Sequence, residues 1–413
     1  MSDLLTRAAP RVAGSGPRRL TGASVARWGQ PRTWTLLLVA CLVLVPATWV
    51  MLRPGSTQLT HVDRYPGTAP GEWGPGATWA SPPLLGETRP VPVGGSDIVL
   101  LTAERRLVLV GGADGTVRWD VPLPDGEVHT PPAPTRVAGA AVLGAHIGDR
   151  FVWWSLKDGQ AIEIDVPAGS TLSMLGEAPL VAVNGTEAMA VVDEHPTPIR
   201  VPTNTKALAA HEDGTITAAG SQGWWHLGRD GSVGSKGDWE SRSGVTPTVG
   251  PYTGGFILLI RPGDPATLEI HADRTTDVRF VASDSFVLPG GAGGGSLTWM
   301  PSPSGTWGIF GRTLVDLRAS TITDLGAWST QTVTADRAYG HIDGQTVVVG
   351  PAIPRGVLAP GEAIPDVVTA NGALVRGPAP ASKATKQQST GGGIDPRRSN
   401  DVAYFLPPRR TAS

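Results

Sequence analysis

Short apolar runs recur along most of the chain, from about residue 91 to 377, and Gly, Asp, Asn and Pro separate them. Several runs alternate apolar and polar residues with period two, as half-buried strands do. Clear examples are 97–103, 116–122, 161–167 and 267–273. Apart from one long apolar run near the N-terminus, no window of eleven residues carries a helical stripe. The pattern therefore predicts an all-β domain.

The long apolar run, residues 34–52, predicts one transmembrane helix. Its 19 residues carry no charge, and at about 1.5 Å per residue they span about 28 Å, close to the hydrocarbon thickness of a bilayer. Six Arg precede the run and only Arg53 follows closely. The positive-inside rule then places the N-terminus in the cytoplasm. We expect a single-pass protein of the cell membrane with an extracytoplasmic C-terminal domain.

Two alternatives to a permanent anchor concern the same segment. Residues 38–41 end in Cys41 and fit a lipobox, but the run stays apolar for eleven residues beyond that cysteine. A cleaved signal peptide needs a small-x-small site after the apolar run, and residues 50–56 offer none that is clear. The uncleaved anchor is the preferred interpretation, with lipidation of Cys41 or other cleavage left open.

Internal repetition predicts the architecture. The segments 101–110, 333–342 and 368–377 each combine an apolar residue, Thr-Ala, a polar turn and a second strand. With looser copies, turns fall near 104, 149, 184, 213, 254, 284, 336 and 371. Their mean spacing of about 38 residues is typical of a four-stranded β-propeller blade. We predict a β-propeller with seven blades, with six or eight as alternatives, whose last blade closes on strand material from the start of the domain. A sandwich pair and a β-solenoid are competing all-β folds.

These patterns divide the chain into five predicted parts. They are a disordered cytoplasmic N-tail (1–33), the transmembrane helix (34–52), a Pro/Gly-rich linker (53–90), the β-propeller (91–377) and a disordered basic C-tail (378–413). The stretch 401–408, DVAYFLPP, stands out in the C-tail because it is apolar. It is either an unstructured end, a strand added to a blade, or a partner-docking segment.

Charge and cysteine content narrow the function. The part from 54 to 377 has 21 basic and 33 acidic residues, a net charge of −12. Such a domain repels phosphates, so we expect no nucleic-acid partner. The single cysteine excludes an intramolecular disulfide and a multi-cysteine metal site. Arg outnumbers Lys 29 to 5, as in GC-rich, actinobacterial-like genomes.

Catalytic and cofactor motifs are missing from the sequence. It contains no H-E-x-x-H, G-x-S-x-G, Walker A or D-x-[DN]-x-[DN]-G pattern. We therefore predict no catalytic residues, no metal and no cofactor. Of the eight His, three fall at similar places beside predicted hairpins: His146, His211 and His341. Their propeller positions would bring them near the channel or one face, although a structural role is the preferred interpretation for each.

Tryptophan supplies the candidate binding residues. The chain has 14 Trp against 4 Tyr and 6 Phe. Two adjacent pairs lie in predicted strands, where neighbours point to opposite faces. One member of each pair should pack between blades, and the other could stack on a sugar ring or a partner side chain. The candidate platform, with core packing as the preferred alternative, consists of Trp153, Trp154, Trp224 and Trp225.

The stretch 114–121, DGTVRWDV, with weaker copies elsewhere, resembles the repeats of quinoprotein-type (pyrroloquinoline-quinone-like) propellers in membrane-anchored bacterial proteins. Such propellers include cofactor-dependent dehydrogenases and non-catalytic scaffolds, and the dehydrogenase pattern has a vicinal cysteine pair that this chain lacks. The resemblance therefore implies a non-catalytic scaffold that binds a protein or cell-envelope partner. The alternative is a quinone-cofactor oxidoreductase-like or carbohydrate-active enzyme.

Overall fold

The described part of the chain contains 33 strands and no helix. The structure is a computed structural model, and it describes residues 57–409 except 87, 184, 240–245, 262–266, 274–277, 283–298 and 381–400. No helix able to cross a membrane occurs among these residues. The predicted N-tail, the predicted transmembrane helix at 34–52 and Cys41 lie outside them. They stay predictions.

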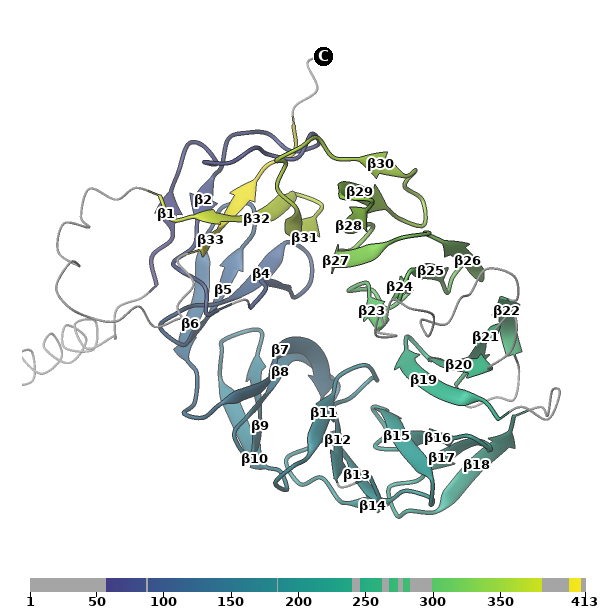
Figure 1. The fold of residues 1–413 in the computed structure, drawn as a ribbon. Helices are drawn as coiled ribbons and strands as arrows, with labels where there is room; N and C mark the ends of the chain where they lie inside the picture. Colours follow the sequence, from purple (N-terminus) through teal and green to yellow (C-terminus); the bar gives the residue numbers. More distant parts are fainter. Residues whose placement is uncertain are drawn as a thin grey trace, which may run out of the picture. The chain divides into compact units, whose positions relative to one another are not determined.

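The strands form eight antiparallel sheets, the blades of a β-propeller, which follow one another around a ring (Figure 1). Blade 1 has β3 (Val91–Pro92), β4 (Asp97–Leu101), β5 (Arg106–Gly111) and β6 (Val117–Pro122). Blade 2 has β7 (Val128–Val137), β8 (Ala140–Ile147), β9 (Arg150–Ser155) and β10 (Ala161–Asp165). Blade 3 has β11 (Thr171–Ser173), β12 (Leu180–Val183), β13 (Glu187–Ala190) and β14 (Ile199–Arg200). Blade 4 has β15 (Thr205–Ala210), β16 (Ile216–Gly220), β17 (Gly223–Leu227) and β18 (Val233–Asp238).

The remaining four blades complete the ring. Blade 5 has β19 (Thr248–Thr253), β20 (Phe256–Arg261), β21 (Thr267–Ala272) and β22 (Val278–Ala282). Blade 6 has β23 (Trp299–Pro301), β24 (Trp307–Phe310), β25 (Thr313–Asp316) and β26 (Thr321–Asp324). Blade 7 has β27 (Ser329–Val333), β28 (Ala338–Ile342), β29 (Gln345–Val349) and β30 (Gly356–Val357). Blade 8 has β31 (Pro365–Thr369), β32 (Gly372–Pro378), β33 (Asp401–Leu406), β2 (Trp79–Ala80) and β1 (Thr60–His61).

The all-β propeller is confirmed, but the preferred count of seven blades is wrong, because there are eight. The turn near 184 joins the second and third strands of blade 3, whereas the turn near 213 joins the first and second strands of blade 4. The interval between these two signals therefore looked too short for a blade. Similar turn sequences at different places within a blade made the spacing an unreliable measure of blade number.

Blade 8 closes the ring with strands from both ends of the propeller. β33 lies between β32 and β2, so Phe405 pairs with Leu374 on one side and with Trp79 on the other. The expected closure on material from the start of the domain is thus observed. The propeller also extends beyond the predicted limits of 91 and 377: β1 and β2 come from the predicted linker, and β33 comes from the predicted disordered tail. The pairing removes sheet edges that would otherwise be exposed.

Apolar clusters between neighbouring blades form the core. Buried side chains join blades 1 and 2, 2 and 3, 3 and 4, 4 and 5, 5 and 6, 6 and 7, and 8 and 1. Central strands are covered on both faces, and β5 accordingly has five consecutive buried residues after Arg106. The outermost strand β10 has no buried residue. The continuous apolar runs in the sequence mark central strands for this reason.

Candidate functional site

One end of the propeller carries the turns between the first and second strands of the blades, and we call this end the first-turn face. A wide hollow lies on it. The hollow has a volume of about 850 Å³. Seven of the eight blades contribute to its lining. Its lining consists of 91–95, Pro134, 174–176, Thr253, Gly254, 301–305, Val333, Ala335 and 368–370. We call this hollow the channel mouth.

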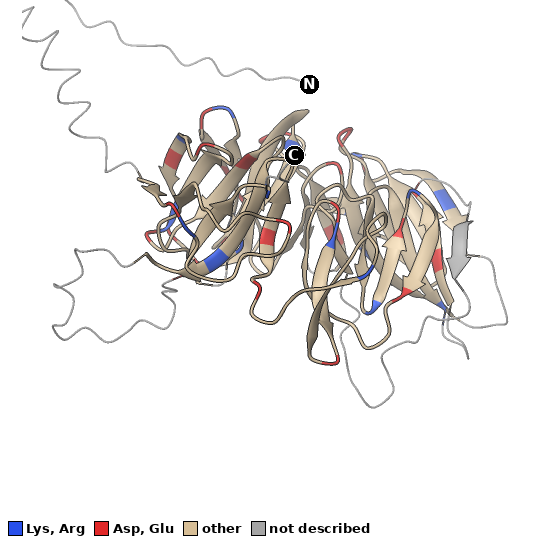
Figure 2. Cartoon of the chain, turned by 90° about the horizontal axis from the view of Figure 1, so that it is seen from above, with Lys and Arg blue, Asp and Glu red and all other residues tan. Residues whose placement is uncertain are grey.

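The channel mouth is neutral. Val, Pro, Gly, Ala, Ser, Thr, Leu and Met line it, and none of the described lining residues is ionisable. Leu175 is 39% exposed there, one of few large apolar side chains so exposed in the described part of the chain. Acidic residues are instead spread over many blades (Figure 2). The opening therefore suits a neutral or apolar group better than a charged one.

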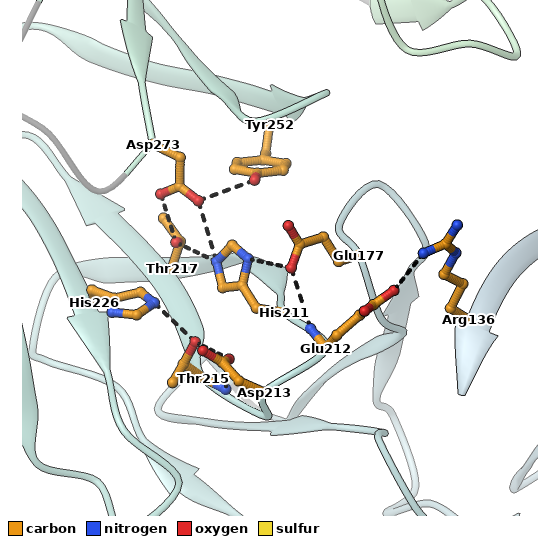
Figure 3. Close-up of polar contacts among 10 residues, drawn as sticks. All are labelled: Arg136, Glu177, His211, Glu212, Asp213, Thr215, Thr217, His226, Tyr252 and Asp273. Atoms are coloured by element: carbon orange, nitrogen blue, oxygen red, sulfur yellow. Dashed lines mark hydrogen bonds and ion pairs between the residues drawn. The ribbon is translucent and has the colours of Figure 1, made fainter. Parts of the chain in front are cut away.

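A buried histidine network lies beside the channel mouth (Figure 3). The Nε2 atom of His211 lies 2.8 Å from Thr217 Oγ1 and 3.2 Å from Asp273 Oδ2. Thr217 donates its hydroxyl hydrogen to Asp273 Oδ1 at 2.8 Å, and Tyr252 donates to Asp273 Oδ2 at 3.1 Å. Because Thr217 has given away its only hydrogen, its oxygen accepts from His211, and Nε2 of His211 carries a proton.

This network connects three blades. His211 and Thr217 belong to blade 4, Tyr252 and Asp273 to blade 5, and Glu177 to the first turn of blade 3. The Nδ1 atom of His211 lies 3.5 Å from Glu177 Oε2. His211 is 1% exposed and Thr217 is 0% exposed, so neither reaches a molecule bound in the channel mouth. The network holds the turns of blades 3 to 5 in place.

The exposed edge of the network carries opposite charges. Glu212 donates its backbone N–H to Glu177 Oε2 at 3.3 Å, and its own carboxylate accepts from Arg136 Nη1 at 2.8 Å. Hydrogen bonding to Glu212 raises the pKa of Arg136. Arg136 lies in β7 of blade 2, so the ion pair connects the long hairpin of blade 2 to blade 4. Because both side chains are exposed, the pair adds little to stability.

A second buried polar cluster lies inside blade 5. Arg261 donates from Nε to Glu269 Oε1 at 2.7 Å, and His271 Nε2 lies 3.1 Å from Glu269 Oε2. Burial by itself would raise the pKa of Glu269, but the hydrogen bonds from Arg261 and His271 outweigh it, and that pKa is lowered. The ring of Trp239 meets His271 edge-on at 4.7 Å. The cluster has no opening to the channel mouth and is structural.

The described residues contain no group of three or more His, Cys, Asp or Glu side chains that could hold a metal ion. The three histidines that the sequence places beside hairpins are not brought together. His146 lies in blade 2, where burial lowers its pKa and its ring is 5.0 Å from that of His129. His341 lies in β28 of blade 7. Of the three, only His211 joins the network beside the channel mouth.

The four candidate tryptophans pack between blades. Trp153 and Trp154 point to opposite sides of blade 2, towards blades 3 and 1 respectively. Trp224 points from blade 4 towards blade 5, and Trp225, which is half-buried, towards blade 3. The structure therefore does not bring the four together on one surface. All four contribute to packing between blades, and a binding role for any of them stays a prediction.

Sequence reasoning missed most of the network. Glu177, Thr217, Tyr252 and Asp273 carry no motif, and between 34 and 96 residues separate Glu177 from the other network members in blades 4 and 5. The proximity of His211 to a hairpin was the only local signal. The neutral channel mouth had one indirect signal, since the turn residues Gly, Pro, Ser and Thr make up more than half of its lining.

Comparisons with known proteins found similar solved structures at low sequence identity. No protein-family model matches the chain, and no curated protein matches it. The solved dihydro-heme d1 dehydrogenase NirN is 11% identical, with a TM-score of 0.37; the match covers 67% of this chain and 66% of that one. Two structures of AztD from Citrobacter koseri are 8% and 9% identical, each with a TM-score of 0.40. Each match covers 67% of this chain and 87% of the AztD chain. The resemblance to quinoprotein-type repeats has no family match behind it.

Proposed function

We propose that this protein is a non-catalytic binding scaffold whose propeller holds a protein or cell-envelope partner at the first-turn face. The helix predicted at 34–52 would tether it to the cell membrane, with the propeller on the extracytoplasmic side. The proposal rests on one observation, the neutral channel mouth of about 850 Å³.

The lining of the channel mouth explains how it would bind. First turns of six blades and Pro134 in β7 of blade 2 supply the lining, and the antiparallel sheets fix them in place. A rigid opening loses little conformational entropy on binding. Leu175 and the neighbouring Val and Pro side chains offer apolar contact, and the Ser, Thr and backbone groups offer hydrogen bonds. Such a surface recognises a neutral segment by shape.

A quinone-cofactor oxidoreductase or a carbohydrate-active enzyme is the alternative. Either would need acid–base groups that reach a substrate. In the described part of the chain, the His and carboxylate groups nearest the channel mouth bind one another, and His211 and Asp273 are enclosed at the junction of blades 4 and 5. This arrangement favours the scaffold. Assays with alcohols or sugars and added quinone would support the enzyme only if turnover appears.

The test compares two variants of the full-length protein in native membranes. Leu175→Asp places a charge in the channel mouth, and Val357→Asp places one on β30 of blade 7, where Val357 is 60% exposed. Affinity capture with quantitative mass spectrometry should recover the same enriched partner with the wild type and Val357→Asp. Leu175→Asp should reduce its recovery about tenfold, since an unpaired charge in an apolar contact is costly.

Three outcomes would contradict the proposal. They are equal recovery with both variants, loss with both, and a C-terminal reporter that is accessible only from the cytoplasm. The reporter tests the membrane arrangement separately, because a cytoplasmic propeller could still bind a partner at the channel mouth.

A further inference from the structure

A second hollow lies between blades 2 and 3, and unequal strand lengths create it. β7 and β8 of blade 2 have 10 and 8 residues, whereas the strands of blade 3 have between 2 and 4 residues. Blade 3 is therefore too short to cover the whole facing side of blade 2. The uncovered part forms a groove of about 470 Å³.

One wall of this groove is apolar. Val137, Val142 and Trp153 point from blade 2 towards blade 3 and belong to the core cluster between these blades, and 4–5% of each residue's surface is exposed where they line the groove. Ile162 pairs with Trp153 across β9 and β10 and is 38% exposed. Ile162 and Leu175 are therefore two exposed large apolar side chains that line separate hollows. Trp153, a candidate binding residue in the sequence, forms part of the wall.

The opposite wall is acidic and fixed in place. It consists of Asp193, Glu194 and His195, in the loop that follows β13. Asp193 accepts from the backbone N–H of His195 at 2.9 Å and from Arg229 Nη2 at 3.1 Å. Ala138 donates its backbone N–H to Val192 O at 3.0 Å, which joins this loop to the tip of the β7–β8 hairpin.

Glu194 leaves the groove with unbalanced negative charge. It is exposed, and no ion pair between it and another described residue is present, whereas Asp193 is already paired with Arg229. The surrounding part of the chain, 54–377, has 21 basic and 33 acidic residues. A cation in the groove would therefore meet an attractive local charge and an attractive overall field.

The shape of the groove suits an extended chain. Its apolar wall takes residues from all four strands of blade 2, from Val137 in β7 to Ile162 in β10. Four strands about 4.8 Å apart span about 14 Å, the length of about four extended residues at 3.3 Å each. An extended segment places successive side chains on opposite sides. One set can then contact the apolar wall while the other faces Asp193 and Glu194.

We propose that this groove binds an extended segment of a partner polypeptide in which apolar residues alternate with Lys or Arg. The apolar side chains pack mainly on Ile162, with the small exposed parts of Trp153 and Val142 beneath them, and a cationic side chain pairs with Glu194. The fixed acidic loop lowers the entropy cost of binding. The site is separate from the channel mouth and does not depend on the function proposed for it.

The probe is a fluorescein-labelled peptide, Gly-Ser-Leu-Lys-Leu-Lys-Ser-Gly, titrated with the full-length protein in detergent and followed by anisotropy. Two control peptides replace both Lys by Glu or both Leu by Ser. We expect each control peptide to bind at least about tenfold more weakly than the probe, because each lacks one of the two contacts.

Protein variants locate the binding. Ile162→Asp should weaken probe binding about tenfold, and Glu194→Gln should weaken it severalfold at low salt and less at high salt. Matched controls are Val357→Asp, and Glu104→Gln in the exposed β4–β5 turn of blade 1. Both should bind like the wild type, as should Leu175→Asp. Circular dichroism and thermal unfolding of each variant will show that the fold is intact.

Several results would overturn the proposal. They are equal binding of the Lys and Glu peptides, unchanged binding by Ile162→Asp, and displacement of the probe by a peptide of residues 381–400, which would make the occupant a segment of this chain. Dimerisation that Ile162→Asp abolishes would likewise identify a second copy as the occupant. Loss of probe binding in Leu175→Asp would place the peptide in the channel mouth instead.

Discussion

Removing β33 should open the propeller. A chain that ends at residue 400 lacks the strand between β32 and β2, and so loses six paired positions with β32 and two with β2. Five consecutive residues of β33 are buried: Val402, Ala403, Tyr404, Phe405 and Leu406. Together they contribute to two apolar clusters, one of which joins blade 8 to blade 1.

The size of the effect follows from this burial. Burying a large apolar side chain stabilises a protein by about 1.5–3 kcal/mol, so four of them contribute about 6–12 kcal/mol. That range is similar to the whole free energy of unfolding of a typical domain, about 5–15 kcal/mol. The truncated chain should therefore unfold or expose the edges of β2 and β32.

A single substitution in β33 measures the contribution of this strand to stability within a folded protein. The ring of Phe405 stacks on Trp79 with centroids 5.7 Å apart. Phe405→Ala should lower the free energy of unfolding by about 3–5 kcal/mol. Val357→Ala, at an exposed position of β30, should change it by less than about 0.5 kcal/mol. Urea unfolding followed by tryptophan fluorescence measures both changes.

The pairing can also be restored from outside. A synthetic peptide of residues 401–409 should bind the truncated chain and raise its unfolding midpoint, whereas a scrambled peptide should not. If truncation leaves the unfolding midpoint unchanged, or if Phe405→Ala costs no more than Val357→Ala, then β33 does not close the ring and this account of the fold is refuted.

Two further predictions concern buried ionisable groups. Arg261→Met should destabilise the protein by about 3–5 kcal/mol, because it leaves the Glu269 carboxylate buried without its cation. The double variant Arg261→Met with Glu269→Leu should recover most of that loss in urea unfolding. If it recovers none, Arg261 and Glu269 do not act as a buried ion pair. The pKa of Glu269 is lowered in the fold. The stability that its ionised carboxylate contributes is therefore present above its unfolded pKa of about 4.3 and is lost as the pH falls further. The difference in free energy of unfolding between the wild type and the double variant should accordingly narrow in acid. Burial raises the pKa of Tyr339 to about 12, and burial also raises the pKa of Tyr65 and Tyr404. Alkaline absorbance titration should therefore show fewer than the 4 tyrosines ionised at pH 11 in the folded protein and all of them in urea, and full ionisation in both states would refute this burial.

Local patterns of residues predict the class of fold and most strands between 91 and 377. Period-two alternation marks half-buried strands such as β6, and continuous apolar runs mark central ones such as β5, because these patterns depend on which faces neighbouring elements cover. Gly and Asp at hairpin turns reflect local backbone requirements. At the tip of the β7–β8 hairpin, Ala138 and Gly139 both have positive φ, as a two-residue turn demands. Local chemistry suffices for features of this kind.

The blade number, the strand partners of β33 and the sites depend on the tertiary structure. β2 and β33 lie more than 300 residues apart and pair in a register that neither short strand specifies alone. The His211 network joins three blades, so no local motif reports it. The groove beside Ile162 exists because blade 2 is longer than blade 3. Each of these features depends on contacts between distant segments, and a local pattern of residues carries no information about which segments meet.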